Sequence, residues 1–432
     1  MNKLKTLALS LLVCCTYYGC VSPVGQEYKS LPPGNWRGVL YLDDQSRILP
    51  SDKDQIETIN NSEGELPFNF EVVYDSPEKF HIVLKNGKER ILVDDIYFGR
   101  DKATAKDTLK IRFKEFDSYI DAIFEERIME GFWHVNYKNN YKIRFKAFHG
   151  DSIRFFQMSN EKPMDFSGRW ATTFSKGTED EYPAIGVFEQ RGNELTGTFM
   201  TETGDYRYLQ GNVAHNKAWL SCFDGAHAYL FEAKINADKS MIGQYRSGLT
   251  FIEPFEGVRD ENVKLKDATL LTTVKKGNTK FIVNHPNENG EIINSSEGKY
   301  KGKVKIIEIM GTWCPNCKDA TTYLRELLTK NDSIEVISMA FERYRDKDKS
   351  LTQLKRYKEK SGLPFEIVLG GYYDKKDASL QLPQIEKLVS YPTLIIVDRN
   401  DNIVKIFTGF YGPATPEYKN FIHDIEETIN ML

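Results

Sequence analysis

Two of the chain's six cysteines lie two residues apart in the stretch "MGTWCPNCKDA", residues 310–320. A pair at this spacing can be a redox-active dithiol, half of a zinc site, or two sulfurs that are close by chance. A structural zinc site needs about four ligands. The chain has no second CxxC motif and no paired-histidine motif to supply the other two. We therefore interpret Cys314 and Cys317 as a dithiol and expect no metal.

The flanking sequence predicts that the two cysteines join a buried strand to a helix. An apolar run, "VKIIEIMG" at residues 304–311, precedes them, and residues 320, 324, 327 and 328 behind them are apolar at helical spacing. Unpaired N–H groups and the helix dipole at a helix N-terminus favour a thiolate by about 0.3–1 kcal/mol, or up to ~2 where partly buried. We expect Cys314 to attack a substrate disulfide and Cys317, one turn further on, to resolve the mixed disulfide.

Two more residues point to the same chemistry. Glu308 interrupts the apolar strand six residues before Cys314. If it is buried, its pKa is raised and it can take the Cys317 proton; on an edge strand it would only face solvent. Pro392, in "SYPT", begins a second apolar strand. A cis bond before Pro392 would expose the backbone of Tyr391 to an extended substrate, although an ordinary proline at a strand start is the alternative.

These motifs together resemble the thioredoxin superfamily. "GTWCPNC", the strand acid and "YPT" carry the likeness over about residues 280–432. The segment between "GTWCPNC" and "YPT" resembles the TlpA/ResA branch of envelope thiol–disulfide oxidoreductases. The C-terminal "FTGFYGPAT" resembles the Bacteroidetes-type lipoproteins of that branch. That branch often has a glutamate and a proline just after the CxxC motif, where this chain has Ala320 and Thr322.

The resemblance implies a role for each matching residue. Cys314 matches the attacking cysteine, Cys317 the resolving cysteine, Glu308 the strand acid and Pro392 the cis-proline. It also implies that the redox-active disulfide Cys314–Cys317 is the only redox group, without a cofactor. We expect substrate contacts at four neighbouring positions: Trp313, Pro315, Asn316 and Tyr391.

The N-terminus has the pattern of an export signal. Lys3 and Lys5 precede an uncharged run that is too short to span a bilayer and ends in "TYYGC". We expect a lipoprotein-type signal peptide at 1–19, lipidation of Cys20 and a tether at 20–30; an unlipidated signal peptide is the alternative. Both place the chain in the periplasm or cell envelope, where disulfides form. Cys222, in "AWLSCF", is interpreted as a buried apolar residue.

Residues 31–262 are predicted to be β-rich and mainly antiparallel. Short segments rich in aromatic and β-branched residues alternate with turn sequences, and a Gly-x-Trp unit occurs at 34–36, 131–133 and 168–170. The unequal spacing argues against a regular repeat, and we predict two β subdomains with a seam near 160–166. Residues 263–432, where strands and helices alternate, are predicted to form the α/β thioredoxin-like domain.

The predicted function is the reduction of protein disulfides by dithiol exchange. A net charge of −4 argues against nucleic acid as a partner. Because the periplasm is oxidising, the resemblance implies a membrane thiol-transfer protein as electron donor. A peroxiredoxin-like thiol peroxidase, and a binding lipoprotein with an auxiliary redox domain, remain as alternatives.

Overall fold

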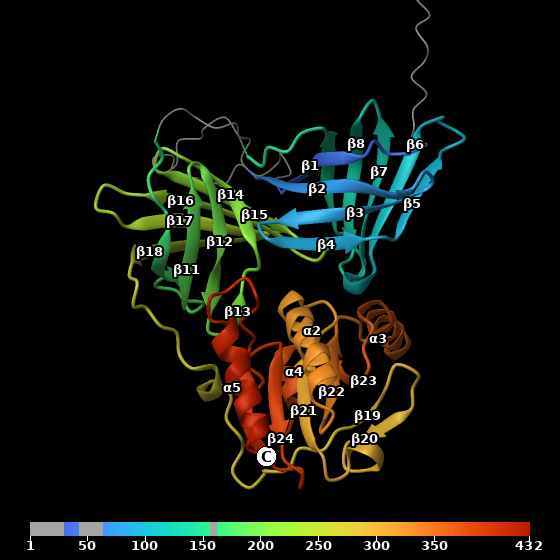
Figure 1. Cartoon of the computed structure of the whole chain (residues 1–432), viewed down its shortest axis with the longest axis vertical. Coiled ribbons are helices and arrows are strands. Elements are labelled where there is room, and N and C mark those ends of the chain that lie inside the picture. The colour runs from blue at the N-terminus through green and yellow to red at the C-terminus, as the bar shows by residue number, and fades with distance from the viewer. Residues whose placement is uncertain (1–29, 43–63, 156–161) are drawn as a thin grey trace, which may run out of the picture.

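The structure, a computed structural model, describes residues 30–42, 64–155 and 162–432. The predicted signal peptide, Cys20 and all but the last residue of the predicted tether lie outside these ranges. The described chain forms two antiparallel β modules and a C-terminal α/β domain (Figure 1). The predicted fold class is therefore confirmed, including the two β subdomains. Within the described ranges, no helix is both long enough and apolar enough to cross a bilayer.

The first module is an open nine-stranded sheet, which we call the half-barrel. Its strand order is β4-β3-β2-β1-β9-β8-β7-β6-β5. The strands are β1 (Gly34–Tyr41), β2 (Glu65–Ser76), β3 (Lys79–Asn86), β4 (Glu89–Val93), β5 (Ile96–Arg100), β6 (Asp107–Phe113), β7 (Ser118–Glu125), β8 (Ile128–Val135) and β9 (Lys142–His149), with a 3-10 turn, η1, at Lys114–Phe116.

The second module closes on itself because β11 pairs with both β10 and β12, and we call it the barrel. Closure removes the exposed strand edges that an open sheet keeps. Its strands are β10 (Gly168–Phe174), β11 (Tyr182–Arg191), β12 (Glu194–Thr201), β13 (Gly204–Asp205), β14 (Leu209–Ala214), β15 (Lys217–Phe223), β16 (Ala228–Ile235), β17 (Met241–Ser247) and β18 (Phe251–Arg259).

The Gly-x-Trp units supply the cores of both modules. Trp36 and Trp133 are buried in the half-barrel core and Trp170 in the barrel core. At Gly131 a Cβ atom would lie 1.9 Å from the Asp121 carbonyl oxygen, so only glycine permits the close approach of β8 to β7. Phe223 of the barrel packs on Phe68 of the half-barrel, with ring centroids 4.5 Å apart. The two modules therefore share one apolar interface.

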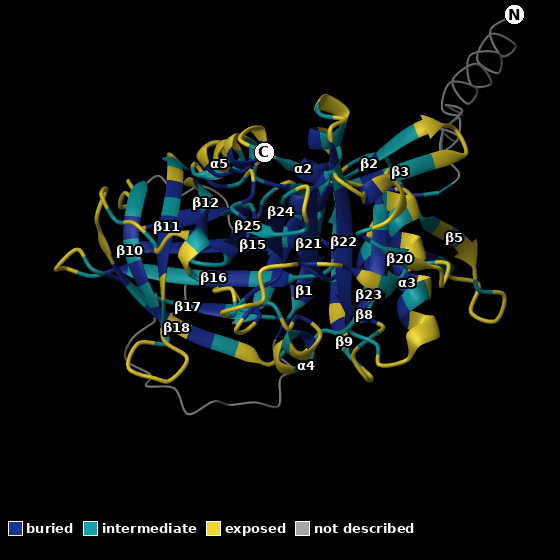
Figure 2. Cartoon of the chain, turned by 90° about the horizontal axis from the view of Figure 1, so that it is seen from below, coloured by how far each residue is buried: buried dark blue, intermediate teal, exposed yellow. Residues whose placement is uncertain are grey.

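The C-terminal domain is a five-stranded sheet in the order β23-β22-β21-β24-β25, with β21, β22 and β23 parallel. Helices connect its parallel strands, as parallel pairs require. Its elements are η2 (Ala268–Leu270), β19 (Asn284–Pro286), β20 (Ile292–Asn294), η3 (Gly298–Tyr300), β21 (Val304–Met310), α2 (Pro315–Lys330), β22 (Ile334–Glu342), α3 (Lys347–Ser361), β23 (Glu366–Tyr372), α4 (Lys375–Leu380), β24 (Thr393–Val397), β25 (Ile403–Thr408) and α5 (Tyr418–Asn430). Figure 2 shows the central strands β21 and β22 largely buried.

One local prediction is wrong. The sequence "ATPEY" predicts a helix with Thr415 as its N-cap and Pro416 at its first position. The last helix instead begins at Tyr418, and the Thr415 hydroxyl donates to the Gly412 carbonyl oxygen at 2.9 Å. The Gly412 N–H donates to Asp205 of the barrel at 2.8 Å, so a contact between modules fixes this turn.

Candidate active site

The two cysteines of the CPNC motif lie where β21 passes into α2. Cys314 is the N-cap residue of α2, and Cys317 lies in its first turn. The pair forms a disulfide with Cα atoms 5.2 Å apart. The Cys317 N–H donates to the Cys314 sulfur at 3.2 Å. The arrangement supplies Cys314 with the N-terminal backbone donor that stabilises a thiolate.

The two sulfurs differ in access. Cys314 is 6% exposed, whereas Cys317 is fully buried in the domain core. Only Cys314 can therefore meet an incoming disulfide. Cys317 lies behind it at bonding distance, the position that a resolving thiol needs.

Glu308 is buried on a central strand. Its neighbours across β21 are Ser338 on β22 and Leu394 on β24, which rules out the solvent-facing edge position. The carboxylate accepts from the Thr321 hydroxyl at 2.8 Å and from the Ser338 hydroxyl. Burial raises the pKa of Glu308 to about 7, against the lowering effect of the two hydroxyl donors. Thr321 lies one turn after Cys317 on α2, so Glu308 contacts the helix face that carries the buried thiol.

The Tyr391–Pro392 peptide bond is cis. Its segment lies against the dithiol, with the Tyr391 carbonyl oxygen 3.7 Å from the Cys314 sulfur. The structure thus brings together Cys314, Cys317 and Pro392, with Glu308 beneath α2. These are the four residues predicted to carry the chemistry.

The predicted substrate-contact residues are placed differently from one another. The Trp313 indole donates to the Phe341 carbonyl oxygen at 2.9 Å, and its ring packs edge-on against Tyr391, with centroids 5.5 Å apart. Pro315 is buried, and the Asn316 amide donates to the Asp205 carbonyl oxygen of the barrel at 3.2 Å. The Pro315 carbonyl oxygen accepts from Arg207 at 3.5 Å, so Pro315 and Asn316 both contact the barrel.

Two neighbours of the dithiol were not predicted. Glu342, at the end of β22, accepts from the N–H and the hydroxyl of Thr312 at 3.0 and 2.8 Å, and burial raises its pKa to about 7. The Arg343 guanidinium lies over the rings of both Trp313 and Tyr373, 4.1 and 3.9 Å from their centroids. In the sequence, Glu342 and Arg343 are marked only by their place at the end of an apolar strand.

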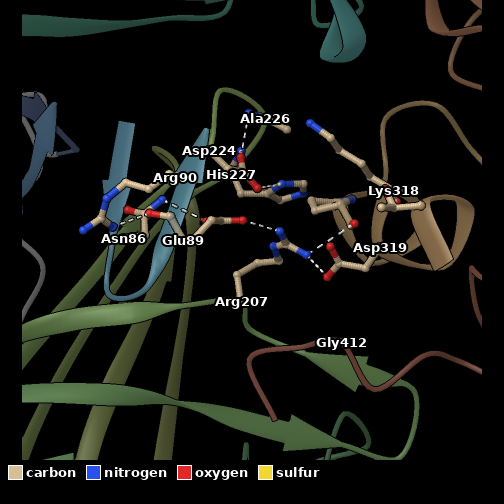
Figure 3. A network of polar contacts seen from close by, with 12 residues as sticks. Asn86, Glu89, Arg90, Arg207, Asp224, Ala226, His227, Lys318, Asp319 and Gly412 are labelled. Carbon is tan, nitrogen blue, oxygen red and sulfur yellow. Dashed lines mark hydrogen bonds and ion pairs between the residues drawn. The ribbon is translucent and has the colours of Figure 1, made fainter. Parts of the chain in front are cut away.

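The barrel contacts the N-terminal end of α2 through Arg207. Figure 3 shows this guanidinium between Asp319 of α2 and Glu89 of the half-barrel, with an ion pair to each. Asp205 lies close by and caps the turn by accepting the Arg207 N–H at 2.8 Å. All three modules thus meet at the buried Arg207 guanidinium. Its partner Asp319 lies two residues beyond Cys317.

The charges at this junction do not balance, because four carboxyl groups surround one guanidinium. Burial alone would lower the pKa of Arg207, but the surrounding acids raise it well above its ordinary value; in decreasing order of effect they are Asp319, Glu89, Asp205 and Asp224. Burial raises the pKa of Asp319 to about 7, with Asp205 and Glu89 adding to the effect of burial and Arg207 opposing it. Arg207 therefore stays charged, and Asp319 takes up a proton near neutral pH.

Two further residues, Cys222 and Asp224, belong to the barrel, and Asp224 lies in the polar network around Arg207 (Figure 3). Cys222 is fully buried in the barrel, as predicted, and burial raises its thiol pKa well above the ordinary value. Asp224 accepts from the backbone of Ala226 and His227 at 2.7 Å, and therefore holds a turn. In the part of the chain that the structure describes, no three His, Cys, Asp or Glu side chains are grouped to hold a metal ion.

Comparison with known proteins agrees with this geometry. The family model described as Redoxin matches residues 267–422. "Thiol-disulfide oxidoreductase ResA" from Geobacillus kaustophilus is 27% identical over 112 residues, which are 26% of this chain and 57% of that protein. The ResA protein of Geobacillus thermodenitrificans matches equally. The chain thus spans little more than half the length of these curated relatives.

Two solved structures are also similar to part of this chain. A thiol-disulfide oxidoreductase from Bacteroides fragilis is 16% identical, with a TM-score of 0.26, over 34% of this chain and 98% of that one. The thioredoxin domain of a Bacteroides vulgatus thiol-disulfide oxidoreductase is 17% identical, with a TM-score of 0.27, over 35% and 99%. The Redoxin match, the strand–CPNC–helix junction and the cis-proline beside it together support the C-terminal domain as a thioredoxin-superfamily thiol–disulfide oxidoreductase.

Proposed function

We propose that this chain is a cell-envelope reductase of protein disulfides that works by dithiol exchange through Cys314 and Cys317. The observation that carries the proposal is the Cys314 sulfur at the N-terminus of α2, receiving the Cys317 N–H, with a buried partner thiol behind it. An accessible sulfur stabilised as a thiolate attacks, and an enclosed sulfur resolves.

The reaction proceeds in two balanced exchanges. The Cys314 thiolate attacks one sulfur of the substrate disulfide, the substrate S–S bond breaks, and one substrate thiolate leaves. Cys317 then gives up its proton to Glu308 and attacks the Cys314 sulfur of the mixed disulfide. The second substrate thiolate leaves, and two electrons have passed from the chain to the substrate, which has become two thiols. The chain is left as the Cys314–Cys317 disulfide.

A further dithiol must then reduce the chain again. We propose a membrane thiol-transfer protein for this step, together with lipidation of Cys20 to keep the chain at the membrane. Both rest on the sequence pattern and on the resemblance to envelope oxidoreductases, and the periplasm is the matching compartment.

Single-turnover experiments with the purified full chain test the dithiol assignment. Chain reduced with dithiothreitol and desalted is mixed with a disulfide-bridged peptide, and free peptide thiols are counted. We expect two per chain for the unaltered protein and for Cys222→Ser. We expect none for Cys314→Ser, and a trapped mixed disulfide, visible by mass, for Cys317→Ser. A chain with both thiols reduced that releases no peptide thiol would refute the proposed function.

A further inference from the structure

A loop of the barrel lies directly against the dithiol. Residues Thr201–Tyr206, which connect β12 to β14 through β13, contact the cis-proline segment and the start of α2. The Ser390 hydroxyl donates to the Thr203 carbonyl oxygen at 3.5 Å, and the Asn316 amide donates to the Asp205 carbonyl oxygen at 3.2 Å. The loop therefore forms one wall of the approach to Cys314.

This wall is held in place from both ends. At Gly409, next to the cis-proline segment, a Cβ atom would lie 2.3 Å from the Thr203 carbonyl oxygen, so the two backbones touch. Behind the loop, Arg207 pairs with Asp319 and Glu89, and Asp205 accepts the Gly412 N–H at 2.8 Å. An incoming substrate thus meets a loop whose position is fixed by contacts on both sides.

Between the loop and the cis-proline segment lies a cavity of about 420 Å³. Two tyrosines of the barrel, Tyr182 and Tyr206, line it, with their hydroxyl oxygens 2.6 Å apart. On the other side Asn316, Ser390 and Tyr391 line it, and the Tyr391 carbonyl oxygen is 3.7 Å from the Cys314 sulfur, so one residue connects the cavity to the attacking thiol.

The charge of this cavity is one-sided. Glu202 and Asp205 are among its lining residues, and none of the eleven is Lys, Arg or His. Asp205 is buried and already accepts two backbone N–H groups, whereas Glu202 is half-buried on the rim. The Arg343 guanidinium lies over the Trp313 ring, which packs against Tyr391, and is not among the lining residues. The cavity wall that the barrel contributes is therefore acidic.

Resting on the proposed dithiol exchange, we infer that this cavity is a substrate subsite formed jointly by the barrel and the C-terminal domain. It takes an extended peptide segment with a cationic side chain next to the disulfide to be reduced. A fixed wall at a sulfur that is 6% exposed admits a single strand and excludes the broad surface of a folded protein. The Glu202 carboxylate provides the charge preference.

The test compares two disulfide-bridged peptides that differ only in whether Lys or Glu flanks the cystine. Reduced full chain is mixed with each, and the second-order rate constant of peptide thiol release is measured. We expect the Lys peptide to react about threefold faster, the effect of one partly exposed ion pair. Glu202→Gln should bring the ratio close to one. Glu194→Gln, an exposed acid at the far end of β12, is the matched control and should keep the ratio.

A second variant tests the cavity by volume. Pro183 is an exposed rim residue, and Pro183→Trp should fill the cavity mouth. The rate constant for the Lys peptide, divided by that for the small 2-hydroxyethyl disulfide, should then fall by about tenfold. The peptide loses its packing contacts with the cavity, whereas the small disulfide makes none there.

The outcomes separate the two proposals. No thiol release from any of these disulfides by fully reduced chain would refute the proposed function itself. Normal reduction of the 2-hydroxyethyl disulfide, with equal rates for the two peptides or a faster Glu peptide, would refute the subsite alone. A ratio that Glu202→Gln leaves unchanged, or rapid reduction of a disulfide at the surface of a folded protein, would refute it equally.

Discussion

Two buried acids on opposite sides of helix α2 share a raised pKa but have different surroundings. Glu308 lies beneath the helix, inside one domain, and its hydrogen-bond partners are the uncharged hydroxyls of Thr321 and Ser338. Asp319 lies at the junction of three modules and pairs with the Arg207 guanidinium. The pKa of each is raised to about 7 by burial.

The different surroundings suit the two acids to different roles, proton transfer for Glu308 and docking of the modules for Asp319. A buried carboxyl held by two hydroxyls can gain or lose a proton without moving a neighbour, which suits a proton acceptor. A carboxyl that shares a buried cation with other acids is coupled to their positions, so its removal affects the docking of the modules. Glu308 is therefore expected to govern a reaction step, and the Arg207 junction to govern how the barrel sits on the active site.

The largest expected effect comes from breaking the junction. Arg207→Met leaves Asp319, Glu89 and Asp205 buried without their cation, and should lower the free energy of unfolding by about 3–5 kcal/mol. Because burial raises the pKa of Asp319 to about 7, the deficit should be greatest near about pH 8, where this acid is ionised, and should shrink near about pH 5. Urea unfolding of the full chain at both pH values measures it.

A control sets the scale for the Arg207 variant. Arg191→Met removes a barrel arginine whose side chain is 79% exposed and pairs with Glu189. It should change stability by under about 1 kcal/mol. An Arg207→Met deficit no larger than that of the control would mean that the junction does not hold the modules together.

The sequence predicts the surroundings of the dithiol and Glu308 but not the junction at Arg207. Cys314, Cys317 and Glu308 lie within ten residues, so an apolar strand followed by a helical pattern is enough to place them. Pro392 can be placed from its position at the start of a second apolar strand. Arg207 and Asp319 are 112 residues apart, and Glu89 is 118 residues from Arg207. Such contacts depend on how whole modules dock, and neither periodicity nor spacing carries that information.

The next largest effect is expected at Glu308. Glu308→Gln keeps the shape of the side chain but cannot accept the Cys317 proton. The release of substrate from the mixed disulfide should slow by about 100-fold, within the usual range for a positioned general base. In the unaltered chain this step should accelerate as pH rises through about 7. Rapid-quench trapping of the mixed disulfide at a series of pH values measures it.

The stability of the same variant gives an independent check. The folded-state pKa of Glu308 is raised from 4.5 to about 7, so its contribution is greatest below 4.5 and is lost as pH rises through 7. Glu308→Gln should therefore gain up to about 3 kcal/mol relative to the unaltered chain between these pH values. A rate profile that Glu308→Gln leaves unchanged would remove Glu308 from the mechanism, even if this stability difference appears.

The smallest expected effect tests whether the hydroxyl partners tune the acid. Ser338 lies beside Glu308 on the adjacent strand, and the hydrogen bond from its hydroxyl lowers the Glu308 pKa. Ser338→Ala should raise that pKa further, since the carboxylate loses a donor, and should move the midpoint of the release step to higher pH by up to about one unit. Ser333→Ala, which removes an exposed hydroxyl bonded to Asn331, should leave the midpoint in place. A midpoint that stays in place in Ser338→Ala, or moves to lower pH, would mean that the Ser338 hydroxyl does not lower the proton affinity of Glu308. Of the two hydroxyl partners that distinguish Glu308 from Asp319, only Thr321 would then be left to tune the acid.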